Sequence, residues 1–460
     1  MKAPVIRAGG FKKIKTMNYK NLADKLVSRS LRKGAESAEV YIQTGRNLSV
    51  RVRNSDIETI QEAASSGVGF RVLVNGSMGF SHCNDFSDKA LDETLERAIA
   101  FAKLTTPEDH NTLPRAKDHE KVEGLYDPEI GKVPMEKKID MALELESLAM
   151  KDERITNSSG ASFGERETEI FIANSHGLHK SLKSGMCSLG VGVVAQKGEE
   201  RNTGWESCAR RYFSDLESLE KIAESAARKA WELLDTKMVS TQRAAVIFDP
   251  VVASSLIGGI IAAINGERVL QGASFLRDSM NEQFASELLT IIDDGTRPRG
   301  TGSTPFDGEG VPTQKRTLVE AGVLRSFIYN TIAAKRAGVE STGNASRGGF
   351  TSMPSIGTHN LYVAPGESSP EEIIASTQRG LLLKGVTGYG INPVNGNFSG
   401  GASGFWIENG KIVHPVKGLT IAGSADTILK GIDMVADDVD MNRSFTAPTV
   451  RIAEMQIGGA

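Results

Sequence analysis

The same order of helix and strand patterns occurs twice in the first 238 residues, and this recurrence constrains the fold more than any other feature. Residues 18–106 begin with a helical period from Leu22, continue through two β-hairpin patterns, and end with an amphipathic helix. Residues 135–238 repeat that order after a predicted linker at 107–134. We therefore expect the N-terminal half to contain two pseudo-repeated α+β units, each with the order helix, hairpin, hairpin, helix.

Turn and capping residues place the predicted elements within these units. Alternating apolar residues on either side of residues 44–47 predict a hairpin turn there, and Asn75-Gly76 predicts a second one because this dipeptide tolerates positive φ angles. Residues 174–177 predict the corresponding turn in the second unit. Ser214 and Glu217 match a Ser-x-x-Glu capping box, so we expect the last helix of that unit to begin at Ser214.

The second half of the chain consists of short apolar runs separated by glycine, of which the whole sequence contains 48. This texture predicts a C-terminal domain, residues 239–460, that is mostly antiparallel β-sheet with a few helices, so the fold class is α+β. One helix has Ser369 as N-cap, Pro370 in the first turn, Glu372 completing the box and Gly380 as its end. The predicted strands cover residues 244–248, 288–292, 323–329, 359–363, 405–407 and 451–457.

Charge and composition exclude several classes of protein. The 54 Lys and Arg and 57 Asp and Glu residues are well mixed along the chain, which argues against direct nucleic-acid binding. No apolar run reaches the roughly 18 residues of a membrane span, and the N-terminus lacks the apolar stretch of a secretory signal. We expect residues 1–17 to be a disordered tail or to precede a start at Met17, and the protein to be cytoplasmic. Three cysteines, Cys83, Cys187 and Cys208, predict reduced thiols and no disulfide framework.

The seven histidines do not form the pattern of a zinc peptidase. That pattern places two histidines one helical turn apart, with a glutamate between them that activates the bound water. His176 and His179 are three residues apart but lie in a predicted turn, so a surface turn is favoured over a metal site. His82 next to Cys83 is favoured as packing, since structural zinc needs four ligands.

Three further motifs match known chemistry only in part. Residues 160–164 fit the Gly-x-Ser-x-Gly pattern of a nucleophile elbow, but their context differs, so Ser162 is predicted to be a loop serine and a Ser162 hydrolase stays an alternative. The acidic segments at 293–294 and 307–309 are favoured as solvated turns, because their spacing does not match an EF-hand. The glycines at 67–69 lack the third glycine of a dinucleotide loop, so no nucleotide cofactor is indicated.

Five sequence blocks together resemble the TldD/PmbA family, also called modulators of DNA gyrase. They are spread over nearly the whole chain from about residue 20, and their joint order is more specific than any one of them. The blocks are SGVGFRV at 66–72, STPFDGEG at 303–310, STGNA at 341–345, GFWIENG at 404–410 and PVKGLTIAG at 415–423.

The resemblance implies a PmbA (TldE)-type subunit that lacks the family's catalytic metal site. In TldD-type subunits a His-Glu-x-x-x-His helix and a late cysteine hold zinc, whereas PmbA-type subunits lack both. The matching helix here, residues 255–267, has Ile257, Gly258 and Ala262 at the degenerate ligand positions, and no cysteine follows Cys208. We therefore expect no catalytic, metal-binding or cofactor-binding residue in this chain, with zinc only in a TldD-type partner.

The implied function is that of a non-catalytic subunit in a heteromeric metallopeptidase that degrades or processes unfolded or leader-type peptides. Strand addition to a sheet edge would bind such peptides with little sequence preference. Gly388, Tyr389, Phe398 and Ser399 are the candidate edge, although a purely structural sheet explains residues 385–404 equally well. A homodimeric peptide-binding scaffold without proteolysis is the alternative. The sequence leaves open the peptide substrate and the choice between homodimer and heterodimer.

Overall fold

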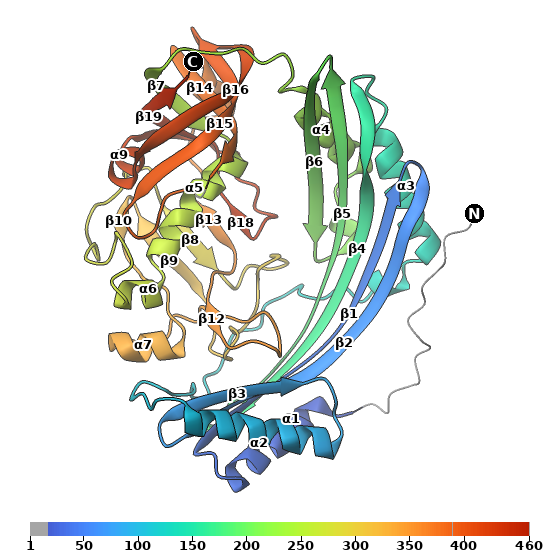
Figure 1. Cartoon of the computed structure of the whole chain (residues 1–460), viewed down its shortest axis with the longest axis vertical. Helices are drawn as coiled ribbons and strands as arrows, with labels where there is room; N and C mark the ends of the chain where they lie inside the picture. Colours follow the sequence, from blue (N-terminus) through green and yellow to red (C-terminus); the bar gives the residue numbers. More distant parts are fainter. Residues whose placement is uncertain (1–16, 389, 460) are drawn as a thin grey trace.

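The two copies of the repeated order form one continuous sheet. The computed structural model describes residues 17–388 and 390–459, and its N-terminal half is a six-stranded antiparallel sheet in the order β3-β2-β1-β4-β5-β6. Its long strands curve into half of a barrel, and β1 and β4 join the two units at its centre (Figure 1). The elements are α1 (Tyr19–Arg32), β1 (Ser37–Arg53), β2 (Asp56–Val74), β3 (Ser77–Cys83) and α2 (Asp88–Leu104), then α3 (Met135–Ala149), β4 (Ile155–Asn174), β5 (His179–Lys197), β6 (Glu200–Arg210) and α4 (Leu219–Trp231).

Each unit contains three consecutive strands rather than two separate hairpins. The turn predicted at residues 44–47 is wrong, because β1 continues through it and the chain reverses at Asn54 and Ser55, with φ angles of 53° and 60°. Gly45 lies in mid-strand, where a Cβ atom would stand 3.0 Å from the Glu167 carbonyl oxygen of β4. The turn at Asn75-Gly76 is confirmed, with φ angles of 50° and 73°.

The helices pack on the convex face of the sheet in the same way in both units. A Cβ atom at Gly79 in β3 would lie 2.0 Å from the Ala98 carbonyl oxygen of α2. A Cβ atom at Gly204 in β6 would lie 2.0 Å from the Ala226 carbonyl oxygen of α4. The third strand of each unit therefore needs a glycine where the closing helix crosses it, and the concave face stays free of helices (Figure 1).

Helix α4 begins later than predicted. Ser214 lies in the short 3-10 helix Phe213–Asp215, and the N-cap of α4 is Ser218, whose hydroxyl accepts from the Lys221 N–H at 3.3 Å. The Glu217 carboxylate binds Arg210 at 2.6 Å instead of completing a capping box. The predicted cap is wrong because the Glu217 carboxylate pairs with Arg210, seven residues earlier in the chain. The apolar face of the helix is buried as predicted at Ile222, Ala223, Ala226 and Ala230.

A closed barrel of five strands forms the core of the C-terminal half. Its strands follow the order β16-β15-β14-β7-β19, and a pairing between β16 and β19 closes it, with β17 added outside β19. A second sheet has the order β10-β9-β8-β13-β18, and β11 pairs with β12. The strands are β7 (Gln242–Phe248), β8 (Ile291–Asp294), β9 (Lys315–Glu320), β10 (Val323–Leu324), β11 (Ala345–Ser346), β12 (Ser355–Ile356), β13 (Leu361–Val363), β14 (Arg379–Thr387), β15 (Asn397–Glu408), β16 (Lys411–Ser424), β17 (Ile432–Val435), β18 (Phe445–Thr446) and β19 (Val450–Gly458). The mixed α+β class is confirmed.

Five short or medium helices accompany these sheets, namely α5 (Pro250–Ala263), α6 (Gly266–Leu270), α7 (Thr331–Ala337), α8 (Pro370–Ala375) and α9 (Ala425–Lys430). The predicted capping box of α8, Ser369 with Glu372, is confirmed. The predicted end at Gly380 is wrong, because α8 ends at Ala375 and Gly380 lies in β14, where a Cβ atom would come within 2.8 Å of the Ala245 carbonyl oxygen. The strand predicted at 323–329 stops at Leu324.

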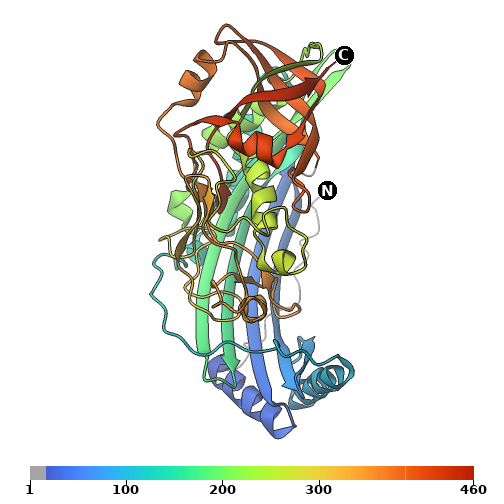
Figure 2. The ribbon, with the colours of Figure 1, turned by 90° about the vertical axis from the view of Figure 1, so that its left-hand side faces the viewer.

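The two halves face each other (Figure 1), and the C-terminal half covers most of the length of the sheet, with α1 and α2 extending beyond it (Figure 2). Phe306 packs against Tyr41, Ile172 and Leu178 of the N-terminal half, which gives the interface a small apolar core. The predicted tail falls outside the described residues, apart from Met17. Across residues 17–388 and 390–459, every helix is too short or too polar to span a bilayer.

Candidate functional site

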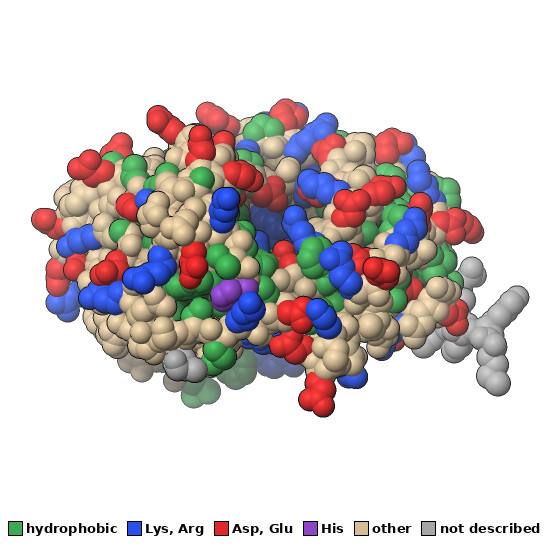
Figure 3. Space-filling view, turned by 90° about the horizontal axis from the view of Figure 1, so that it is seen from above, with side chains coloured by type: hydrophobic (Ala, Val, Ile, Leu, Met, Phe, Trp, Pro, Cys, Tyr) green, Lys and Arg blue, Asp and Glu red, His purple; other side chains and the backbone are tan. Residues whose placement is uncertain are grey.

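Small and polar side chains line part of the concave face of the sheet. Residues directly opposite each other in an antiparallel register share a face. Val50, Phe163 and Leu189 face the helices, so Ser49, Gly164 and Ser188, which neighbour them in register, face the C-terminal domain. Seen from above, this space is a hollow between the two halves, with Lys or Arg side chains at its floor (Figure 3). The concave face of the sheet is therefore an exposed surface that lies opposite the C-terminal domain.

Three cavities lie in a row along this concave face, and together we call them the groove. The apolar pocket has a volume of about 180 Å³, the arginine pocket about 210 Å³ and the outer cavity about 680 Å³. The apolar and arginine pockets share Tyr41, Ile170 and Arg347, and the arginine pocket shares Met186 with the outer cavity. The shared walls show that the three cavities are neighbours, in a series from the centre of the sheet to the edge strand β6.

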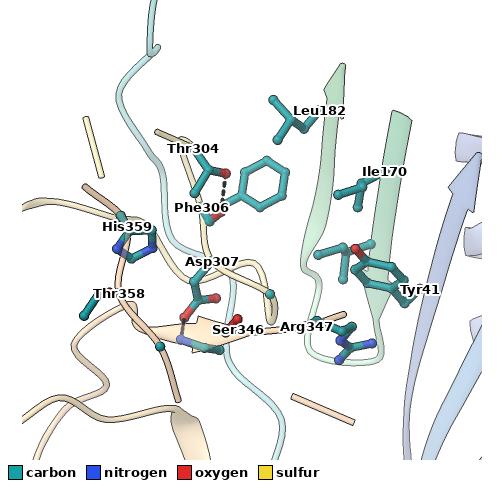
Figure 4. Close-up of a pocket in the computed structure, with 14 residues that line it drawn as sticks. Tyr41, Ile170, Leu182, Thr304, Phe306, Asp307, Ser346, Arg347, Thr358 and His359 are labelled. Carbon is teal, nitrogen blue, oxygen red and sulfur yellow. Dashed lines mark hydrogen bonds between the residues drawn. The ribbon is translucent and has the colours of Figure 1, made fainter. Parts of the chain in front are cut away.

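The apolar pocket has one wall from the sheet and one from loops of the C-terminal domain (Figure 4). Asp307 sits in the loop wall, where its carboxylate accepts backbone N–H bonds from Glu309, Val311 and Ala345 at 2.9–3.0 Å. Burial, and then the charge of Glu309, raise the pKa of Asp307 to about 7. The sheet wall consists of Ile170, Ile172 and Leu182.

An aspartate–histidine pair closes the far side of the apolar pocket. The Nδ1 atom of His359 lies 3.0 Å from Oδ2 of Asp293, and Asn344 donates to the same oxygen at 2.8 Å. Such a pair orients an imidazole for general-base catalysis when a nucleophile contacts the other nitrogen. Among the residues described, no hydroxyl or thiol is hydrogen-bonded to Nε2 of His359, so the pair does not form a nucleophilic triad.

A buried ion network ties the floor of the groove to the C-terminal domain. Arg71 of β2 donates to Glu39 of β1 at 2.6 Å and to Glu309 at 2.7 Å, and Arg347 donates to Glu39 at 2.6 Å. Burial alone would raise the pKa of Glu39, but the guanidinium groups of Arg347 and Arg71 hold it below its ordinary value. The four side chains come from both halves, so the network fixes one half against the other.

The acidic segments predicted to be solvated turns are in fact buried. Asp293, Asp307 and Glu309 are 3%, 4% and 0% exposed. Each is satisfied by partners distant in sequence, respectively His359, Ala345 and Arg71. Spacing alone did not reveal these partners, and the only sequence signal was the co-occurrence of the two family blocks that contain Arg71 and Glu309.

The helix that resembles the zinc-binding helix is α5, and its side chains do not fit a zinc ion. Ile257 is buried in the barrel core, Gly258 lies beside Phe445, and Ala262 is partly exposed. None of these three offers an imidazole, thiolate or carboxylate. Over the described ranges, no three His, Cys, Asp or Glu side chains gather where they would hold a metal ion. The prediction that this chain binds no zinc stays a prediction.

The other histidines and cysteines lie apart from the groove or in structural positions. His176 contacts Ser37 at 3.2 Å in the turn before β5, and His179 contacts Asp24 at 2.7 Å. Burial raises the pKa of the Cys187 thiol to about 12, which makes it unreactive. Cys83, Cys187 and Cys208 are all free thiols.

Ser162 lies within a strand, and the loop prediction for it is wrong. It belongs to β4 and pairs with Arg51 of β1 and Gly190 of β5 on the concave face. The strand-to-helix turn of a nucleophile elbow is therefore not present at this position. The glycines around Ser162 serve the close spacing of strands, since a Cβ atom at Gly160 would lie 2.9 Å from the Val52 carbonyl oxygen.

The candidate peptide edge lies in the closed barrel. Phe398 and Ser399 belong to β15, which has β14 on one side and β16 on the other, and Phe398 is buried. Gly388 follows the end of β14 and lies close to the Ser399 carbonyl oxygen. Tyr389 lies outside the described residues. Phe398 and Ser399 thus do not present a free strand edge.

Known proteins match most of the chain. Three family profiles match: PmbA/TldA metallopeptidase domain 1 at residues 38–102, the central domain at 128–234 and the C-terminal domain at 241–459. The chain is 33% identical to a protein named Metalloprotease PmbA homolog from Haemophilus influenzae, over 93% of each chain. It is 30% identical to Metalloprotease PmbA from Escherichia coli O157:H7, over 92% of this chain and 93% of that one.

Solved structures show the same architecture. A candidate modulator of DNA gyrase from Bacteroides thetaiotaomicron superposes with a TM-score of 0.89 at 27% identity, over 97% of this chain and 100% of that one. TldE from Thermococcus kodakarensis superposes with a TM-score of 0.86 at 26% identity, over 95% and 99%. A protein named Metalloprotease TldD homolog from Buchnera aphidicola is 25% identical, over 92% of both chains. The chain therefore belongs to the PmbA/TldD metallopeptidase family, and within it to the PmbA type.

Proposed function

We propose that this chain is the non-catalytic, PmbA (TldE)-type subunit of a two-component metallopeptidase that degrades or processes unfolded or leader-type peptides. In this proposal a TldD-type partner holds the zinc and performs the cleavage. The observation that carries the proposal is α5, where a family-like fold is kept while Ile257, Gly258 and Ala262 stand at the ligand positions. Changing any single residue would not restore a ligand set.

The groove supports a role in handling peptide. Beside the groove, the concave face carries small side chains such as Ser49 and Ser188, which leave room for an extended chain. Within the groove, the apolar and arginine pockets are each of a size for one or two peptide side chains. In the proposed complex this chain forms part of the chamber wall and contributes to peptide fit.

The test is reconstitution of cleavage from purified subunits. The chain alone is expected to cleave no unfolded polypeptide and to contain no stoichiometric zinc by metal analysis. Mixed with a TldD-type protein from the same organism, it should form a complex that cleaves the polypeptide and loses activity with a chelator. The matched control is a partner with glutamine in place of the glutamate of its His-Glu-x-x-x-His helix, which should form the complex without cleaving.

Two outcomes contradict the proposal. Tightly bound zinc with chelator-sensitive proteolysis by the chain alone would make it an enzyme in its own right. A homodimer that binds peptide, ignores the TldD-type protein and supports no cleavage would instead favour the scaffold function.

A further inference from the structure

Arg211, which follows β6, is a buried guanidinium without an acidic partner. It is 8% exposed, and all of its hydrogen bonds go to backbone carbonyls, namely those of Gly300, Gly185, Thr301 and Ser303, at 2.7–3.2 Å. Burial lowers the pKa of Arg211 to about 10, and no carboxylate within the described chain offsets it. Buried charges are normally paired, so this site holds a positive charge that the described residues leave uncompensated.

The arginine pocket gathers two more guanidinium groups around that charge. Arg166 projects from β4 onto the concave face, is exposed, and forms no ion pair with any described residue. Arg347 lies on the shared wall with the apolar pocket, bound to Glu39 and stacked over the Tyr41 ring at 4.5 Å. The residues that line this pocket include no aspartate or glutamate: Tyr41, Gln43, Arg166, Thr168, Ile170, Ser184, Gly185, Met186, Arg211, Arg347 and Gly348.

This charge pattern favours an anion with a planar, two-oxygen end. Guanidinium groups bind carboxylates through two parallel N–H bonds, and the partly enclosed pocket weakens the screening of those charges by water. A volume of about 210 Å³ accommodates a carboxylate with the main-chain atoms next to it. Lys or Arg side chains are visible at the floor of the hollow (Figure 3).

The apolar pocket adjoins the arginine pocket and narrows the identity of the ligand. The two share Tyr41, Ile170 and Arg347, so a ligand reaching into both must carry an apolar group next to its carboxylate. The apolar pocket has a volume of about 180 Å³, with Ile170, Leu182 and Phe306 on one side (Figure 4). Thr304, Asp307 and His359 line the other side. The pocket suits one large side chain whose apolar surface packs on the first side. The last residue of a peptide presents these two groups on a single α-carbon.

We propose that the groove binds the free C-terminus of a peptide, with the terminal carboxylate in the arginine pocket and a large apolar final side chain in the apolar pocket. This inference rests on the proposed function, in which peptides enter the groove. It gives the bound peptide a direction, since the peptide would be anchored in this subunit by its C-terminal end. Arg166, which is exposed and makes no structural ion pair, is the residue most free to contact the carboxylate.

The experiment measures peptide binding by fluorescence anisotropy with the full-length chain. Three unfolded peptides labelled at the N-terminus differ only at the other end: Phe with a free carboxylate, Phe amide, and Ala with a free carboxylate. We expect the Phe acid to bind about tenfold or more tightly than the Phe amide, as one charge-assisted contact supplies. The Ala acid should also bind more weakly, because it leaves the apolar pocket empty.

Variants identify the pocket. Arg166→Gln should weaken binding of the Phe acid and bring the ratio of acid to amide affinity towards one. Arg166→Lys should keep part of the preference for the acid over the amide. Arg268→Gln is the matched control, because Arg268 is exposed on α6, away from the groove, and has no ion pair among the described residues. Thermal unfolding should be unchanged for all three variants, so a loss of binding cannot be ascribed to misfolding.

Clear results would overturn the inference. The proposed carboxylate site is wrong if the acid and the amide bind equally. It is also wrong if the Arg166→Gln protein keeps the preference for the acid. An amidated peptide with an internal glutamate that binds as tightly as the Phe acid shows that a side-chain carboxylate is recognised instead. If the reconstituted complex cleaves acid and amide equally, the proposed function stands and the inference fails. If the acid preference holds but no partner supports cleavage, the inference stands and the proposed function fails.

Discussion

Replacing Arg71 by methionine tests whether the buried ion network holds the two halves together. The side chains of Arg71, Glu39 and Glu309 are at most 1% exposed, and Arg71 is the cation between the two carboxylates. After Arg71→Met, Glu39 still has Arg347 at 2.6 Å. Glu309 keeps only the Thr331 N–H at 2.8 Å, and so becomes a buried carboxylate without a cation.

The expected loss is large for a single substitution. Removing one partner of a buried ion pair costs about 3–5 kcal/mol, because the other charge stays buried. Arg51→Met is the matched control, because Arg51 lies on the same sheet and forms an exposed ion pair with Glu58. The Arg51 side chain is 54% exposed and the Glu58 side chain 41%. Exposed ion pairs contribute about 0–1 kcal/mol to the free energy of unfolding. The same Arg→Met substitution is made at both positions, so the two variants lose the same side-chain atoms. We therefore expect the free energy of unfolding to fall several times more in Arg71→Met than in Arg51→Met.

Urea unfolding followed by tryptophan fluorescence and far-UV circular dichroism measures this difference. Trp205 and Trp231 report on the N-terminal half and Trp406 on the barrel. Two separate transitions would show that the two halves unfold independently. The double variant Arg71→Met with Glu309→Gln should recover part of the loss, because no charge is then left alone. Equal losses of under about 1 kcal/mol for Arg71→Met and Arg51→Met would refute the reasoning, since the network would then behave like an exposed pair.

Two further predictions concern a proton and a glycine. The pKa of Asp307 is raised from 3.8 to about 7 in the folded protein. Between these two pH values Asp307 is protonated in the folded protein and ionised in the unfolded chain. The free energy of unfolding should therefore fall as pH rises from about 4 to 7, by about 1.4 kcal/mol per unit at most, and then level off. Asp307→Asn should lack this slope in urea titrations at pH 5 to 8, and parallel slopes would contradict it. Gly204→Ala should cost about 1–3 kcal/mol in thermal unfolding, because its Cβ would lie 2.0 Å from a carbonyl oxygen of α4. Gly131→Ala, with open space around it, should be neutral, and equal effects of the two substitutions would count against this packing argument.

Local sequence signals predicted the elements whose causes are local. The Asn75-Gly76 turn and the Ser369 capping box depend on neighbouring residues, and both were correct. Gly45 and Gly380 were interpreted as a turn and a helix stop, but each is required by a strand that lies far away in sequence. A glycine within an apolar pattern therefore has two explanations, and only the tertiary neighbours separate them.

The candidate site was less accessible to sequence reasoning than the fold. Two of the five family blocks, at 303–310 and 341–345, contribute residues to the groove, but the sequence placed the candidate peptide site at residues 385–404 and did not indicate how the charges pair. Arg71 and Glu309 are 238 residues apart, and Glu309 was interpreted as part of a solvated turn. Arg211 had no signal, because its buried position depends on four carbonyl groups from two separate segments.

Because β1 pairs with β4 at the centre of the sheet, one edge of β1 stays unpaired during synthesis until β4 has been made. Val52 pairs with Ala161 and Glu39 with Asn174, so these pairs form only after the later residue has left the ribosome. At about 5–20 residues per second, the inner edge of β1 stays open for roughly 5 to 27 s on the ribosome. During that interval the first three strands expose hydrogen-bonding groups to any other extended chain. A nascent-chain chaperone that shields this edge should raise the yield of native protein, and should matter less once β4 has been made.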